Sequence, residues 1–235
     1  MGGCTNCKGK SGCDHRKGAM LERVADALER LYPTRTWGER DDASVLDTAP
    51  DSEDIAALAD ELATELDAAT FVAPGGPDEA CDYIYVLCMG RPPCAVQVRD
   101  HGVPAPAEWD APDLRLSELY LRVCVSQVAR MAAVQEIAID VTASGGGFVI
   151  RERPRAGVYS APLLRRMQRL VAILPAYDLL HLDFGEISAP PPGHRAGGWR
   201  DRFGAEPAVA NYLFFAQPAT MVTTTWLPRE AGPFA

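Results

Sequence analysis

Lysine is almost missing from this sequence of 235 residues: only Lys8, Lys10 and Lys17 occur, and every other basic side chain is arginine. Between residues 41 and 82 there is no basic side chain at all, whereas thirteen aspartates and glutamates lie there. The formal net charge is −9. Because affinity for phosphate backbones depends mainly on lysine and arginine, this balance argues against a nucleic-acid-binding protein.

Long apolar runs are also missing. No stretch of about 18 apolar residues occurs, so we expect no transmembrane helix and no membrane insertion. The N-terminal segment lacks the apolar centre of an export signal. We therefore expect a cytoplasmic protein, in which cysteines serve more often as metal ligands or catalysts than as disulfide partners.

Signatures of common enzymes are absent as well. The sequence contains no G-x-S-x-G, no H-E-x-x-H and no C-x3-C-x2-C pattern. The segment Gly9-Lys10-Ser11 resembles the end of a phosphate-binding loop, but Cys4 stands where that loop needs its first glycine. A non-catalytic subunit is therefore favoured over a stand-alone enzyme.

What the sequence does contain is a cysteine-rich N-terminus. Cys4, Cys7 and Cys13 form a C-x2-C-x5-C pattern that the three lysines surround, and positive charge favours thiolates. Gly9 and Gly12 let the intervening backbone wrap around a metal. The spacing is similar to that of the last three ligands in the cluster loop of endonuclease III-class DNA glycosylases, and the resemblance ends there. Three thiolates and a fourth ligand suit a [4Fe-4S] cluster or, alternatively, structural zinc.

The fourth ligand has several candidates. Cys88 and Cys94 flank a short turn and are expected at one rim of the sheet, and Cys81 begins the strand that precedes it. Because strand side chains alternate, Cys81 is expected on the opposite face from Cys88. His15 and, less favoured, Asp14 are local alternatives. A second site built from Cys81, Cys88 and Cys94 also stays open.

The periodicity of apolar residues predicts an α+β fold. The expected helices cover residues 19–31, 51–68, 114–134 and 160–174, and the expected strands cover residues 82–89, 94–99, 136–142, 148–153 and 178–184. From residue 94 to residue 184 the order is β-α-β-β-α-β, the ferredoxin-like or split βαβ arrangement. In this scheme Cys124 lies in a helix and belongs to the core. Residues 220–227 are expected to add a strand to the sheet or to form an arm on another subunit.

Four segments follow from these elements. Residues 1–18 form the cysteine-rich loop, and residues 19–80 form a helical, acidic region. Residues 81–184 form the ferredoxin-like core, and residues 185–235 form a Gly/Pro-rich linker with a C-terminal arm. The acidic block is expected to be a solvated helix face or, alternatively, a docking face for a basic partner.

Taken together, the sequence predicts an iron–sulfur protein that carries electrons. It would act as an accessory subunit or partner of a larger oxidoreductase, or bind another protein subunit. A zinc-stapled structural or interaction protein, and a factor for metal or cofactor assembly, are the alternatives.

Overall fold

The computed structural model describes residues 11–41, 50–75, 80–155, 158, 160–215 and 218–229, with only the backbone described for residues 11–20. The helices are α1 (Ser11–Leu31), α2 (Ser52–Leu66), α3 (Ala95–Asp100), α4 (Ala161–Ile173), α5 (Phe184–Ile187), α6 (Trp199–Phe203) and α7 (Val209–Leu213), with 3-10 turns η2 (Ala107–Asp110) and η3 (Leu174–Tyr177). The strands are β1 (Thr70–Ala73), β2 (Cys81–Met89), β3 (Arg115–Ser126), β4 (Met131–Ser144), β5 (Gly147–Pro154), β6 (Leu180–Leu182) and β7 (Thr223–Pro228).

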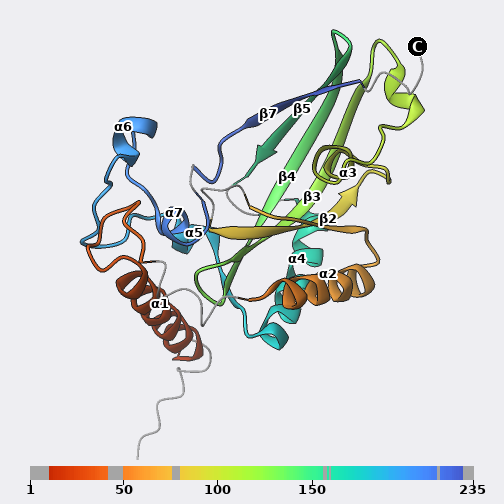
Figure 1. Ribbon diagram of the computed structural model, residues 1–235. Helices are drawn as coiled ribbons and strands as arrows, with labels where there is room; N and C mark the ends of the chain where they lie inside the picture. The colour runs from red at the N-terminus through yellow and green to blue at the C-terminus, as the bar shows by residue number, and fades with distance from the viewer. Residues whose placement is uncertain are drawn as a thin grey trace, which may run out of the picture.

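One mostly antiparallel sheet organises the chain (Figure 1). Its order is β1-β2-β3-β4-β5-β7, and β6 pairs in parallel with the start of β4 at Met131–Ala133. Strand β5 pairs with β4 only from Ile137 onward, so β6 occupies the length of β4 that β5 leaves open. Strand β7 lies against β5, so the C-terminal segment adds a strand to the sheet.

The ferredoxin-like prediction is wrong. The segment expected as a strand over residues 94–99 is helix α3, and the segment expected as a helix over residues 114–134 is β3 together with the start of β4. Strands β3 and β4 form a long antiparallel hairpin where a crossover helix was expected. The result is a curled half-barrel of antiparallel strands rather than two βαβ units.

The misread strand β3 has a physical explanation. Its side chains from Tyr120 to Ser126 are all buried, because both faces of the sheet are covered there. A strand buried on both faces loses the alternation of apolar and polar residues, and periodicity alone cannot then distinguish it from a buried helix.

Helix α2 was predicted correctly, and its sequence explains why. Asp51 is the N-cap and accepts a hydrogen bond from the backbone of Asp54 at 2.8 Å. Its buried residues are the expected apolar stripe: Ile55, Leu58, Ala59, Leu62 and Leu66. The strand over residues 82–89, the hairpin that joins β4 to β5, and helix α4 also follow the predicted pattern. Helix α1 begins at Ser11, so the end of the segment expected as a loop is helical.

The sheet has two different faces. Helices α2 and α4 lie side by side across one face, which we call the outer face (Figure 1). The opposite, inner face packs against residues of α1, α3, α5 and α7 and against Trp109 of η2. On the inner face the Tyr85 hydroxyl of β2 meets the Glu152 carboxylate of β5 at 3.4 Å. These strands are three spacings apart, about 14 Å in a flat sheet, so the sheet curls toward its inner face.

Candidate functional site

The predicted N-terminal ligands lie at the edge of the described structure. Cys4 and Cys7 fall outside the described residues. Cys13, Asp14 and His15 fall in the first turns of α1, where only the backbone is described. Their mutual geometry is therefore left as a prediction from sequence.

The cysteines of the sheet are better defined, and they do not converge. Cys81 and Cys94 belong to the inner-face core with an exposed fraction of 0% each, whereas Cys88 packs against the outer-face core. This separation agrees with the alternation expected for Cys81 and Cys88. Cys94 begins no strand but is the N-cap of α3. Cys124 is buried in the core as expected, although in a strand. Within the described ranges, no three His, Cys, Asp or Glu side chains form a group that could hold a metal.

A network of buried charges lies on the inner face instead. The Arg122 guanidinium of β3 donates from Nη1 to Glu152 of β5 at 2.5 Å, and Arg99 of α3 donates to the other carboxylate oxygen at 2.8 Å. Side chains of Arg122 and Glu152 are only 8% and 6% exposed. Arg99 also pairs with Asp100 at 2.6 Å. Two guanidinium groups are thus balanced by two carboxylates.

Neighbouring polar groups hold Arg122 in place. Gln135 of β4 accepts from Arg122 Nε at 3.3 Å and from Nη2 at 2.6 Å. The amide nitrogen of Gln135 in turn donates to the Ala219 carbonyl at 2.9 Å, which ties the segment before β7 to the sheet. Arg122 Nη1 also donates to the Tyr85 hydroxyl at 3.4 Å. The guanidinium orientation is therefore set from several strands.

The network shifts the pKa values of its members. Burial opposes ionisation of Glu152, but the adjacent Arg122 and Arg99 outweigh it and lower the Glu152 pKa below its usual value. Burial, reinforced by the negative charge of Glu152, raises the pKa of Tyr85 to about 12. Glu152 is therefore a carboxylate and Tyr85 a neutral phenol near neutral pH.

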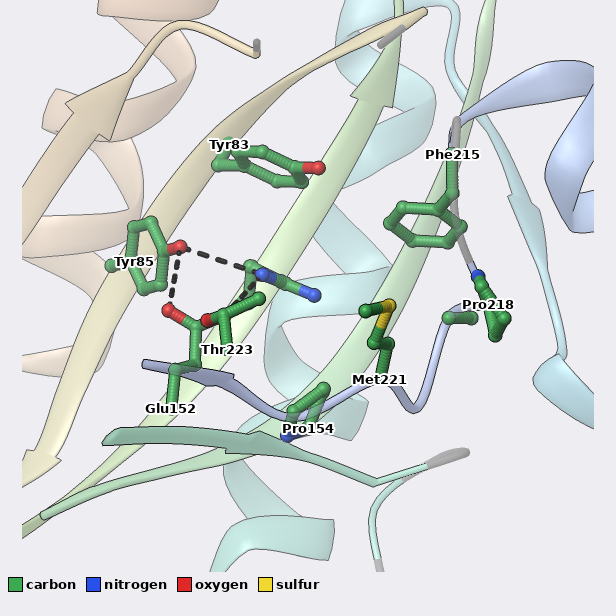
Figure 2. A pocket seen from close by; sticks show the side chains of 10 residues that line it. Tyr83, Tyr85, Glu152, Pro154, Phe215, Pro218, Met221 and Thr223 are labelled. Carbon is green, nitrogen blue, oxygen red and sulfur yellow. Dashed lines mark hydrogen bonds and ion pairs between the residues drawn. The ribbon is translucent and has the colours of Figure 1, made fainter. Parts of the chain in front are cut away.

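A cavity of about 150 Å³ opens beside this network. Figure 2 shows Tyr85 and Glu152 at one side of it, with Tyr83, Phe215 and Met221 around it. The guanidinium carbon of Arg122 lies 4.6 Å from the ring centre of Tyr83 and 5.9 Å from that of Phe215. The cavity thus combines aromatic walls with a buried cation.

A larger groove of about 620 Å³ lies on the outer face beyond α2 and α4, over the distal ends of β3, β4 and β5. Its charges have both signs: Arg115 and Arg151 line it together with Asp140, which is paired with Arg153 at 2.7 Å. We consider the inner cavity the stronger candidate because its polar group is buried and held in a defined orientation.

A second buried carboxyl lies on the same inner face, next to the network: the ring of its partner Tyr120 lies 5.8 Å from that of Tyr85. Glu118 of β3 accepts hydrogen bonds from the Tyr120 hydroxyl and, at 2.9 Å, from the backbone N–H of Ala95 at the start of α3. Burial raises the pKa values of Glu118 and of the nearby Cys94 thiol. This cluster anchors α3 to the sheet.

No local sequence pattern predicts the inner-face network, because its charged members lie far apart along the chain. Arg122 and Glu152 are separated by 30 positions, and Arg99 and Glu152 by 53. Because the segment of β3 was predicted to be a helix, the sequence pattern did not place Arg122 in the same sheet as the strand that carries Glu152. A correct strand assignment, together with the pairing of β3 and β5 with β4, places both on one face.

Comparisons with known proteins add no relative: the chain matches no protein-family profile, no curated protein and no solved structure. Across the described ranges, no helix combines the length and the apolar character needed to cross a membrane.

Proposed function

We propose that this protein binds a [4Fe-4S] cluster through Cys4, Cys7 and Cys13 and carries electrons as an accessory subunit or partner of a larger oxidoreductase. The observation that carries the proposal is the C-x2-C-x5-C spacing inside the one segment that contains all the lysines. Thiolates at this spacing, with a fourth ligand, have the donor chemistry that such clusters require.

The burial of three other cysteines supports this assignment. Cys81, Cys94 and Cys124 each have an exposed fraction of 0% and pack in the inner-face core, so packing alone accounts for them. The proposal therefore assigns the cluster to Cys4, Cys7 and Cys13, whose spacing suits ligation.

The position of α1 also supports the assignment. The helix has 21 residues and begins at Ser11, so Cys13 lies in its first turn. The N-terminal end of a helix carries partial positive charge, which favours a thiolate. The helix enters the core near its other end, through Leu28, Leu31 and neighbouring residues. At 1.5 Å per residue, its start lies about 30 Å along the axis from Leu31, at the periphery of the fold.

A peripheral cluster suits exchange of electrons with another protein. The cluster would accept one electron from a reduced donor and release it to an oxidised acceptor. The same chain also carries a surface for a basic partner protein, formed by the exposed acids of α2, which include Glu53, Asp60 and Glu65. Larger redox enzymes with a basic docking face are the partners that this charge favours.

The test is the metal and sulfide content of the full-length chain purified without oxygen, together with its optical spectrum. We expect iron and acid-labile sulfide in equal amounts and a broad visible absorbance that bleaches on reduction. Cys4→Ser, Cys7→Ser and Cys13→Ser are each expected to abolish both signals. Cys124→Ala is the matched control, because Cys124 is buried in the sheet and should leave the content unchanged.

Other outcomes would replace the proposal. Zinc without sulfide, lost on the same three substitutions, would make the segment a structural staple. Substoichiometric metal that a mild chelator removes would indicate an assembly factor. Unchanged metal content in all three variants would refute a site at these cysteines.

A further inference from the structure

We propose that the inner-face cavity binds a small, uncharged, planar molecule that presents a carbonyl-type oxygen to Arg122. The cavity is separate from the N-terminal cysteines, and the inference is independent of the iron–sulfur proposal. It depends on the hydrogen-bonding capacity of one guanidinium, on the charge balance around it and on the walls of the cavity.

Arg122 has one N–H group more than its described neighbours accept. A guanidinium carries five N–H groups. Nε and one N–H of Nη2 are directed to Gln135, and the two N–H groups of Nη1 are directed to Glu152 and Tyr85. The second N–H of Nη2 has no acceptor within the part of the chain that the structure describes. A buried donor without an acceptor is costly, so this N–H favours an acceptor from a ligand or from water.

The charges around Arg122 favour a neutral ligand. Glu152 already lies 2.5 Å from Nη1, and Arg99 is shared between Glu152 and Asp100. The network is thus neutral before anything binds. An anion seated on Nη2 would lie close to the Glu152 carboxylate in a poorly hydrated site, where like charges repel strongly. A neutral acceptor satisfies the N–H without that repulsion.

The shape and lining of the cavity favour a flat ligand. The walls around the guanidinium are the rings of Tyr83 and Phe215, and Met221, which is 42% exposed, also lines the cavity (Figure 2). Aromatic and thioether groups contact flat, unsaturated molecules favourably. A volume of about 150 Å³ suits a ligand the size of one six-membered ring.

The experiment compares two probes of the same shape that differ in charge, benzamide and benzoate. The full chain is labelled with ¹³C at its methionine methyl groups, so that Met221 at the cavity reports binding and Met167 of α4, on the outer face, serves as the internal control. We expect benzamide to shift the Met221 signal in a saturable way and to leave Met167 unchanged. Benzoate is expected to bind at least on the order of tenfold more weakly than benzamide, because Glu152 repels its carboxylate.

Two matched variants locate the site without changing a charged residue. Ala219→Leu adds bulk to the cavity wall and should abolish the benzamide shift. Thr220→Leu adds bulk at the next residue, which is exposed and does not line the cavity, and should leave the shift intact. Equal or tighter binding of benzoate would overturn the choice of a neutral ligand. Absence of a Met221 shift at millimolar benzamide, or a shift that survives Ala219→Leu, would overturn the site itself.

Discussion

Replacing Glu152 by glutamine removes the carboxylate that neutralises the buried guanidinium of Arg122. The two side chains are 2.5 Å apart and 6% and 8% exposed. Removing one partner of such a pair leaves an uncompensated buried charge, which costs about 3–5 kcal/mol. For a chain of 235 residues that loss corresponds to a drop in Tm of roughly 6–20 °C.

Urea unfolding followed by circular dichroism measures the effect. Glu108→Gln is the matched control, because Glu108 pairs with Arg91 at 2.8 Å but the two side chains are 64% and 81% exposed. An exposed pair of this kind contributes about 0–1 kcal/mol.

A double substitution separates the charge from the packing. Arg122→Met together with Glu152→Met removes both charges and is expected to be far milder than Glu152→Gln alone, because no unpaired charge stays behind. Equal losses for Glu152→Gln and Glu108→Gln would refute the reasoning, since the buried pair would then behave like a surface pair. A double variant less stable than the single one would also refute it.

Three further predictions concern the frame of the sheet. Burial raises the pKa of Glu118 above its usual value of 4.5, so ionisation of this carboxyl opposes folding. The stability that the protonated carboxyl contributes is fully present below pH 4.5 and is lost as the pH rises through the raised pKa. Glu118→Gln should therefore gain stability relative to the parent as pH rises from 4 to 8 in denaturant titrations, and a constant difference would contradict this. A Cβ at Gly147 would lie 2.2 Å from a backbone oxygen of β7, so Gly147→Ala should cost about 1–3 kcal/mol of unfolding free energy, whereas Gly198→Ala, with no atom within 4 Å, should be nearly neutral. Asp51→Ala should cost about 1 kcal/mol through loss of the α2 cap, and an unchanged urea midpoint would show that the cap is dispensable.

Sequence by itself determined the elements whose signals are local. Helix α2 follows from its cap and its apolar stripe, and the β4–β5 hairpin follows from alternation around a glycine turn. The C-x2-C-x5-C pattern is likewise readable without a structure. Each of these depends on neighbours within a few positions, where spacing reflects backbone geometry directly.

Only the tertiary structure decided the sheet and its inner face. From Tyr120 to Ser126, strand β3 is buried on both sides by α2, α4 and the inner core, so these residues carry no alternation that marks them as a strand. Its identity depends on pairing with β2 and β4, and the meeting of Arg122 with Glu152 depends on that pairing and on the curl of the sheet. Contacts between residues this far apart in the chain depend on how whole elements pack together, and a local sequence pattern does not predict them.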